Sequence, residues 1–214
     1  MSKFSWAIGA CVVVAGALVW YAMRPIAAPS APAAEQAAPA ATETATTSAS
    51  APYKVLNTDS AAEFSIDEVL RGKPFTAVGT ASVIEGDETA IRVNARTFTT
   101  DSQGRDRMIA RFILESEKPE NEFVEFRPAG LAALLAANVE AMPVPIEIMG
   151  TLMIRGVAKP ATFRGTIERK GDMHRIVAET KASRADFGLT IPSVPSVASV
   201  ADTVTLKADI VFGQ

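Results

Sequence analysis

Few residues of this chain could carry nucleophilic or metal chemistry, because its 214 residues include one histidine and one cysteine. Cys11 lies within a long apolar run, and no Gly-x-Ser-x-Gly or Ser-x-x-Lys motif marks a serine nucleophile. A structural zinc site takes about four ligands, mostly Cys and His, so these two residues are too few. His174 follows a charged turn, which predicts a solvated surface position. We therefore expect no enzyme, no metal and no cofactor.

The carboxylates are grouped in two ways that could suggest catalysis or calcium binding. Asp67/Glu68 and Asp87/Glu88 are adjacent pairs, and adjacent strand residues point to opposite faces, so each pair is a poor acid–base couple. Residues 115–122 hold glutamates whose spacing matches no calcium loop, which favours a solvated acidic turn. Lys and Arg number 21 against 24 Asp and Glu, so no strongly basic footprint points to nucleic acid.

Residues 1–24 predict attachment to a membrane. Residues 4–23 carry no charge, and a helix of that length spans the roughly 30 Å hydrocarbon layer of a bilayer. Trp6 near one end and Trp20 near the other suit the two membrane interfaces. A cleaved signal peptide is the competing interpretation, although its apolar region typically has only about 7–15 residues. We expect an uncleaved signal anchor, and either interpretation exports the rest of the chain.

Residues 25–52 differ sharply in composition from the rest of the chain. They consist mostly of Ala, Pro, Ser and Thr and lack Lys and Arg, so they cannot bury enough apolar surface to offset the entropy of ordering. We interpret them as a flexible, disordered linker. Residues 53–214 then form one domain, long enough to bury about 70% of its unfolded surface.

Period-two alternation of apolar and polar residues dominates the domain and predicts strands with one buried face each. Turn signals such as Glu85-Gly86-Asp87, Arg155-Gly156 and Lys170-Gly171-Asp172 separate several of these strands. The pattern favours an antiparallel sheet, closed as a barrel or stacked as a sandwich. The predicted strands cover residues 62–70, 73–84, 90–97, 122–127, 146–155, 160–169, 173–184 and 203–212.

Two stretches have helical rather than strand periodicity. Residues 105–115 place Met108, Ile109, Phe112 and Ile113 at helical spacing, and residues 130–140 do the same with Leu131, Leu134, Leu135 and Val139. Both predict short amphipathic helices that pack on the sheet or cap it. Residues 187–201 carry no charge and contain five large aliphatic residues, including Val194. Such a segment either seals the end of the core or lines the mouth of a lipid pocket.

Two motifs resemble the bacterial YceI-like family. Residues 150–163 (GTLMIRGVAKPATF) are similar to its G-x-L-T-I-H-G-V-T-K-P hairpin, and residues 183–188 (SRADFG) are similar to its Arg-x-Asp-Phe-Gly turn. Weaker similarities, such as Arg105-Asp106 and Lys118-Pro119, follow in the same order as in the family. The resemblance therefore covers residues 53–212. One departure is that Arg155 stands where the family has a histidine.

The resemblance implies an all-β fold: an antiparallel, eight-stranded, lipocalin-like barrel with one or two short helices, here preceded by a membrane helix and a disordered linker. It also implies a long apolar ligand of polyisoprenoid or fatty-acyl type inside the barrel. We expect inward-facing apolar side chains of the strands to line the pocket, with one residue from the helix and one from the apolar segment at its mouth. The strand residues are Phe64, Ile66, Phe75, Val93, Ile148, Leu152, Phe163, Ile176, Leu206 and Ile210, and the mouth residues are Phe112 and Ile191.

The functional hypothesis is non-enzymatic binding, carriage or sequestration of such a lipid. The protein would be held in the bacterial inner membrane by its N-terminal helix, with the domain in the periplasm or outside the cell. Cleavage of the signal would instead release the domain into the periplasm. The alternative function is a structural or interaction module of a membrane complex with a filled barrel. Self-association as a homodimer stays open.

Overall fold

The computed structural model describes residues 52–137, 142–193 and 197–214. The predicted membrane helix, the linker up to residue 51, Val139 and Val194 lie outside these ranges. No helix within the described ranges has the length and apolar character needed to cross a bilayer. The described elements all belong to one compact unit, Ser48–Gln214, which contains its own hydrophobic core. A unit with its own core can fold independently.

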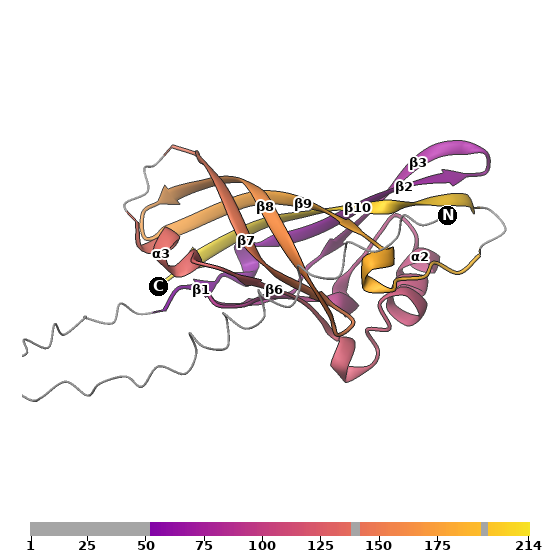
Figure 1. Ribbon diagram of the computed structural model, residues 1–214, viewed down its shortest axis with the longest axis horizontal. Helices are drawn as coiled ribbons and strands as arrows, with labels where there is room; N and C mark the ends of the chain where they lie inside the picture. The colour runs from indigo at the N-terminus through magenta and orange to yellow at the C-terminus, as the bar shows by residue number, and fades with distance from the viewer. Residues whose placement is uncertain (1–51, 138–141, 194–196) are drawn as a thin grey trace, which may run out of the picture. The chain divides into compact units, whose positions relative to one another are not determined.

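Antiparallel strands form a single ten-stranded sheet in the described part of the chain. Neighbouring strands follow the order β3-β2-β10-β9-β8-β7-β6-β5-β4, and β1 pairs with β10. The two ends of this order, β3 and β4, are consecutive in the chain, so the sheet curls back toward itself (Figure 1). The strands are β1 (Lys54–Val55), β2 (Ala61–Leu70), β3 (Lys73–Ala81), β4 (Ile84–Gly86), β5 (Ile91–Asn94), β6 (Phe123–Pro128), β7 (Val144–Ile154), β8 (Val157–Lys170), β9 (Met173–Ser183) and β10 (Val197–Gly213).

Each of the eight predicted strand segments contains a strand, but a count of eight is too low. The additional strands are β1 and β4, which have two and three residues and are too short to show alternation. The predicted strand 90–97 ends early, because the Asn94 side chain accepts a hydrogen bond from the backbone N–H of Arg96 at 3.0 Å. This cap starts the 3-10 turn η2 (Ala95–Thr97). The all-β antiparallel fold is confirmed as a curled, open sheet.

Two hairpins owe their tight turns to backbones with positive φ. Arg155 and Gly156 join β7 to β8 with φ values of 50° and 74°, and Arg71 and Gly72 join β2 to β3 with 51° and 77°. A two-residue hairpin loop of this type matches the twist of the strands that it joins. The Arg155-Gly156 turn signal is therefore confirmed, and Arg71-Gly72 is a further turn of the same kind.

Short helices cover the two ends of the curled sheet. α3 (Leu131–Ala136) lies at one end and α2 (Gln103–Met108) at the other (Figure 1). α2 continues as a π-helical turn, η3 (Ile109–Ile113), in which the backbone N–H of Leu114 bonds to the carbonyl of Ile109 at 2.8 Å. The remaining turns are η1 (Asn57–Asp59), η4 (Pro119–Asn121) and η5 (Ala185–Phe187). Both predicted helices exist: α2 and η3 together cover residues 103–113, and α3 is shorter than its periodic segment.

The core lies on the inner face of the sheet and is densest beneath α3. Leu131 and Leu135 of α3 are almost fully buried, as are Ile210 and Phe212 of β10. The prediction that His174 lies on the surface is wrong, because its side chain is only 4% exposed. His174 is the second residue of β9 and lies on the same inner face as the buried Ile176 and Ala178, so strand alternation extends to the start of the strand.

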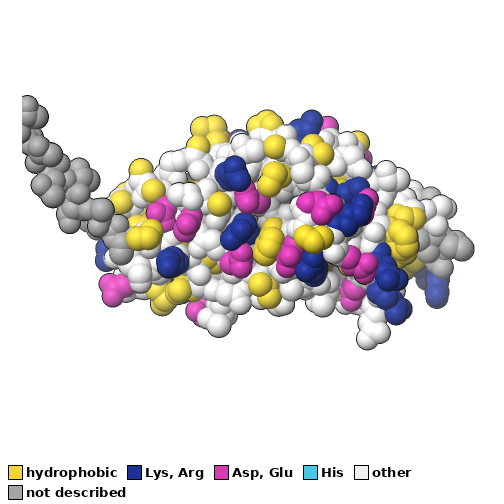
Figure 2. All heavy atoms as spheres, turned by 90° about the horizontal axis from the view of Figure 1, so that it is seen from below, with side chains coloured by type: hydrophobic (Ala, Val, Ile, Leu, Met, Phe, Trp, Pro, Cys, Tyr) yellow, Lys and Arg dark blue, Asp and Glu magenta, His cyan; other side chains and the backbone are white. Residues whose placement is uncertain are grey.

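The outer surface carries charges of both signs. Figure 2 shows a face on which Lys and Arg side chains are interspersed with Asp and Glu, while apolar side chains are scattered between them. Cross-strand ion pairs also lie on the outside of the sheet, such as Arg164 on β8 with Glu147 on β7 at 3.0 Å. Arg175 on β9 donates two hydrogen bonds, of 2.8 and 2.6 Å, to the carboxylate of Asp209 on β10. These pairs support the register of neighbouring strands.

Candidate functional site: an apolar cavity in the curled sheet

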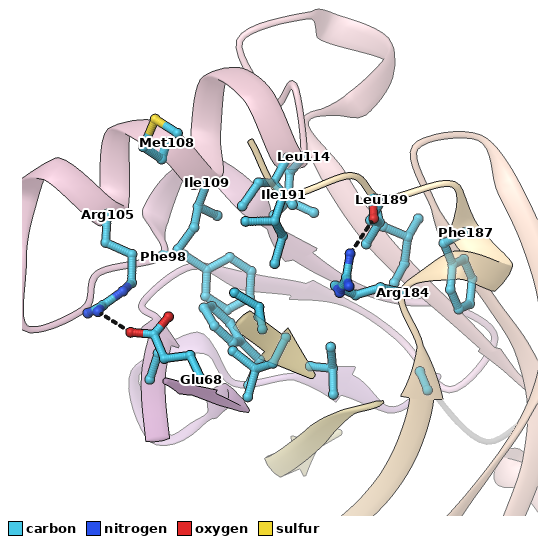
Figure 3. Close-up of a pocket in the computed structure, with 18 of the residues that line it drawn as sticks. Glu68, Phe98, Arg105, Met108, Ile109, Leu114, Arg184, Phe187, Leu189 and Ile191 are labelled. Carbon is cyan, nitrogen blue, oxygen red and sulfur yellow. Dashed lines mark hydrogen bonds and ion pairs between the residues drawn. The ribbon is translucent and has the colours of Figure 1, made fainter. Parts of the chain in front are cut away.

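A cavity of about 510 Å³, partly open to solvent, lies at the end of the sheet next to α2 (Figure 3). Its size falls within the roughly 300–1,000 Å³ typical of small-molecule pockets. The wall is formed by inward residues of β2 and β10, by the α2–η3 segment and by the apolar segment after β9. Most lining side chains are aliphatic or aromatic: Phe64, Ile66, Leu70, Ala77, Phe98, Met108, Ile109, Ile113, Leu114, Val124, Ile154, Ala182, Phe187, Leu189, Ile191, Val197, Val200, Val204 and Leu206.

A second, smaller cavity of about 90 Å³ lies deeper, toward α3. Its wall is again apolar and includes Leu131 of α3, Phe126 and Phe163. The two phenylalanine rings pack together with centroids 4.7 Å apart. This half of the interior is therefore largely filled by side chains, whereas the half beneath α2 is hollow.

The predicted pocket residues divide between these two cavities. Strand residues near the α2 end and one residue of the apolar segment line the larger cavity: Phe64, Ile66, Ile191 and Leu206. Leu206 lines both cavities. The predicted residues nearer α3 line only the smaller cavity: Val93, Ile148, Leu152, Phe163, Ile176 and Ile210. Phe75 and Phe112 line neither cavity.

Phe112 is displaced from the expected mouth position by the π-helical turn. Helical spacing of 3.6 residues per turn would place it beside Ile109, on the face that Ile113 also occupies. Within η3 each hydrogen bond spans five residues instead of four, which turns Phe112 outward. Its side chain is 57% exposed, while Ile109 and Ile113 face the cavity. Phe75 instead lies under the guanidinium of Arg105, at 5.3 Å from the ring centroid.

The apolar segment after β9 forms part of the cavity wall rather than a separate plug. Phe187, Leu189 and Ile191 all line the cavity. Arg184 holds this segment in place, because its side chain donates to the carbonyls of Leu189 at 2.9 Å and Ala201 at 3.0 Å (Figure 3). The Arg-x-Asp-Phe-Gly motif therefore fixes the shape of the wall.

An ion pair marks the polar edge of the cavity. Glu68 on β2 accepts a hydrogen bond of 2.8 Å from Arg105 on α2, and their side chains are 7% and 20% exposed (Figure 3). Arg105 also pairs with Asp101. Because Asp67 faces outward and accepts a hydrogen bond from Thr76, the two adjacent carboxylates do lie on opposite faces. The pair attaches α2 to the sheet and leaves the interior of the cavity apolar.

The acidic turn at residues 115–122 is paired with arginines and a lysine. Glu115 pairs with Arg155 and Lys118, and these cations lower the pKa of its carboxyl group, with the Lys118 hydrogen bond as the largest cause. Arg155 also donates to the carbonyl of Ile113 at 3.1 Å, so it ties the β7–β8 hairpin to the end of η3. Within the described ranges no cluster of His, Cys, Asp and Glu could hold a metal ion.

Sequence reasoning missed Phe98, which lines both cavities. Continued alternation through the predicted strand 90–97 would point residue 98 outward. The η2 turn breaks that alternation, and it is signalled by the Asn94 cap two residues before Arg96. Glu68 and Arg105 were also missed as partners, although alternation from Phe64 and Ile66 places Glu68 on the inner face.

Comparison with known proteins agrees with this fold. The sequence pattern of a YceI-like domain matches residues 53–212. A polyisoprenoid binding domain from Saccharophagus degradans, implicated in plant cell wall breakdown, superposes with a TM-score of 0.63 at 15% identity, covering 76% of this chain and 98% of that one. BcnA from Burkholderia cenocepacia superposes with a TM-score of 0.55 at 15% identity, covering 73% and 98%.

No curated protein matches the chain in sequence. The two structural similarities are too low in identity to carry more than the fold. The domain pattern is decisive for the family, because it spans the whole sheet, both cavities and the two motifs noted in the sequence. Over residues 53–212 the chain belongs to the family of YceI-like domains.

Proposed function

We propose that this protein binds a single long apolar chain, of isoprenoid or fatty-acyl type, without chemical turnover, and so carries or sequesters a lipid. The observation that carries the proposal is the hollow, apolar cavity of about 510 Å³ between the sheet, α2 and the apolar segment. The fold is shared with a domain described as polyisoprenoid binding, which supports an isoprenoid ligand.

The chemistry of the cavity wall suits such a ligand. Each buried methylene group contributes about 0.8 kcal/mol, so a chain can bind tightly without any polar recognition. The charged side chains at the cavity, Glu68, Arg105 and Arg184, are already engaged with each other or with backbone carbonyls. A polar head group would therefore remain near the open side, with the apolar chain inside.

The sequence adds a location to this proposal. The uncharged segment 4–23 would anchor the protein in a bacterial inner membrane, with the domain in the periplasm or outside the cell. Residues 25–52 would give the domain enough reach to collect lipid from the bilayer or deliver it. Cleavage of the segment would leave the same binding domain free in the periplasm.

The alternative is a structural module whose interior is filled. The interior beneath α3 fits that description, because Leu131 and Leu135 seal it and only about 90 Å³ is open there. The larger cavity does not fit it. Buried hollows of this size, lined by apolar groups, weaken a fold that has nothing to put in them.

Co-purified lipid tests the proposal. Organic extracts of the purified full chain and of Ala77→Phe are compared by mass spectrometry. Ala77 is 2% exposed and faces the larger cavity, so a phenylalanine there would occupy the ligand's space. We expect an isoprenoid or acyl lipid in the wild-type extract and at least a tenfold loss of it in the variant.

Val78→Phe is the matched control, because Val78 is the next residue of β3 and its side chain is 40% exposed on the outer face. This variant should retain the lipid at the wild-type level, and any lipid held by the membrane segment is common to all three proteins. Equal lipid content in Ala77→Phe and wild type would contradict binding in the cavity. A wild-type protein that carries no lipid and takes up no prenyl or acyl probe would contradict the function itself.

A further inference from the structure

The interior of the sheet is divided into two chambers rather than forming one continuous tunnel. Phe98, Val124 and Leu206 line both the cavity of about 510 Å³ and the cavity of about 90 Å³, so they form the partition between them. Phe64 reinforces the partition from the larger side, because its ring packs edge-on against Phe98 with centroids 5.2 Å apart and an interplanar angle of 68°. In Figure 3 the Phe98 ring lies in the midst of the side chains that line the larger cavity.

The backbone of Phe98 is fixed on both sides. The Thr97 hydroxyl accepts hydrogen bonds from the backbone N–H groups of Ser82 at 3.2 Å and Val83 at 3.3 Å. Thr99 exchanges two backbone hydrogen bonds with Thr80, of 2.9 and 3.0 Å. Because both neighbours are attached to β3 and the residues that follow it, only the side-chain torsions of Phe98 can move its ring.

The Phe64 ring cannot retreat toward its neighbouring strand. Gly79 lies directly opposite Phe64 in the register of β2 and β3, and a Cβ atom on Gly79 would lie 2.3 Å from Cε1 of the ring. The ring therefore already lies against the bare backbone of Gly79. Of the two aromatic rings, Phe98 is the one whose rotation would open a passage between the chambers.

We propose that the ring of Phe98 sets the depth to which an apolar chain enters this protein, and so sets the chain length that it prefers. This inference rests on the proposed lipid-binding function and deepens it. A ligand that fills the larger chamber ends at Phe98 and Leu206. A longer chain displaces the ring or leaves its end in water.

The inference predicts how affinity depends on chain length. Each added methylene group should raise affinity about fourfold while the chain lengthens inside the larger chamber. Once the end of the chain meets the Phe98 ring, further methylene groups should add nothing. A plot of affinity against length should therefore show a break, which marks the floor of the chamber.

The experiment measures that break with a series of saturated fatty acids from decanoic to tetracosanoic acid, and with farnesol, geranylgeraniol and solanesol. Affinities come from displacement of a fluorescent fatty acid bound to the delipidated compact unit Ser48–Gln214, which holds both chambers and the whole described core. Phe98→Ala removes the aromatic ring from the partition and should join the chambers. Leu206→Ala opens the same partition from the opposite wall and serves as the second variant.

Phe126→Leu is the matched control, because Phe126 lines only the smaller chamber and its loss leaves the partition intact. We expect the break to move to longer chains in Phe98→Ala and Leu206→Ala, and to stay in place in Phe126→Leu. A circular-dichroism melt confirms that each variant is folded.

The outcomes separate this inference from the function on which it rests. If the break falls at the same chain length in wild type, Phe98→Ala and Leu206→Ala, the role of Phe98 is overturned but lipid binding stands. If wild-type affinity rises with chain length and shows no break, the role of Phe98 is likewise overturned and lipid binding stands. Wild-type protein that binds no member of the series would overturn the proposed function itself.

Discussion

His174 is a buried ionisable side chain, with 4% of its surface exposed. Neither ring nitrogen has a protein hydrogen-bond partner, and the Tyr53 ring packs edge-on against it at 5.4 Å. Burial first, and then the positive charge of Arg169, lower the pKa of His174 below its usual value of 6.5. The folded state is therefore more stable with the neutral ring than with the imidazolium ion at this position.

Acidification should destabilise the protein through this residue. The unfolded chain binds a proton near pH 6.5, whereas the folded chain binds it only at lower pH, so the unfolded state holds more protons between these values. The free energy of unfolding should be constant above about pH 7 and fall below about pH 6.5, by at most about 1.4 kcal/mol per pH unit. Urea unfolding across this pH range measures the slope.

His174→Leu provides the control, because it removes the only histidine and keeps an apolar side chain in the core. Its stability should not change between about pH 7 and about pH 5.5, where carboxylates are still ionised. A wild-type stability curve as flat as that of the variant would contradict the role assigned to His174.

The α2–η3 segment forms one wall of the larger cavity, and arginines attach it to the rest of the fold. Arg105 joins it to Glu68 on β2, and Arg155 donates to the carbonyl of Ile113. Just after the segment, Arg96 donates to the carbonyl of Ser116 at 2.6 Å. The position of the wall therefore depends on polar contacts at its edges rather than on its own helical stability, which is small at this length.

The Glu68–Arg105 pair should show strong coupling in a double-mutant cycle. Removing Arg105 leaves the Glu68 carboxylate buried without compensation, so Arg105→Met alone should cost up to about 3 kcal/mol of stability. Glu68→Met should cost less, because Arg105 keeps its ion pair with Asp101. The double variant, with two apolar side chains at the edge of an apolar cavity, should recover most of that loss. Chemical denaturation of the four proteins gives the coupling energy.

The exposed pair Arg111–Glu117 is the comparison for this cycle. Its atoms lie 3.0 Å apart, close to the 2.8 Å of the Glu68–Arg105 pair, but the two side chains are 59% and 61% exposed. Water and salt screen such a pair, and its coupling should stay below about 1 kcal/mol. Equal coupling in the two cycles would mean that burial at the cavity edge has no special effect.

At the scale of the molecule, bound lipid should stabilise the fold. A ligand that binds only the folded state at about one hundred times its dissociation constant adds about 2.7 kcal/mol. Thermal melts with and without farnesol should therefore show a rise in Tm for wild type and Val78→Phe. Ala77→Phe, with its larger cavity occupied, should melt at the same temperature under both conditions.

The alternation of side chains makes the inner face of the sheet predictable from the sequence. Leu206 and Ile210 on β10, and Ile148 and Leu152 on β7, all face the interior as their period-two spacing requires. The departures at Phe112 and Phe98 share one physical origin, which is a change of backbone period. The π-helical turn moves Phe112 outward, and the 3-10 turn after Asn94 moves Phe98 inward. The division into two chambers depends on that second turn. The Asn94 cap signals where the turn starts, but strand alternation does not show that Phe98 then points inward.

The C-terminal strand of this chain occupies the middle of the sheet. β10 pairs with β9 on one side and with β2 on the other, so that Asp209 lies opposite Ala61. During folding, the β2–β3 hairpin and the β7–β8–β9 meander can form from neighbouring residues, but only β10 joins them. Contacts so distant in sequence slow folding. The two pieces of sheet can be joined only once residues 197–213 are available. A chain that stops before residue 197 would hold two separate pieces of sheet, each with a newly exposed edge.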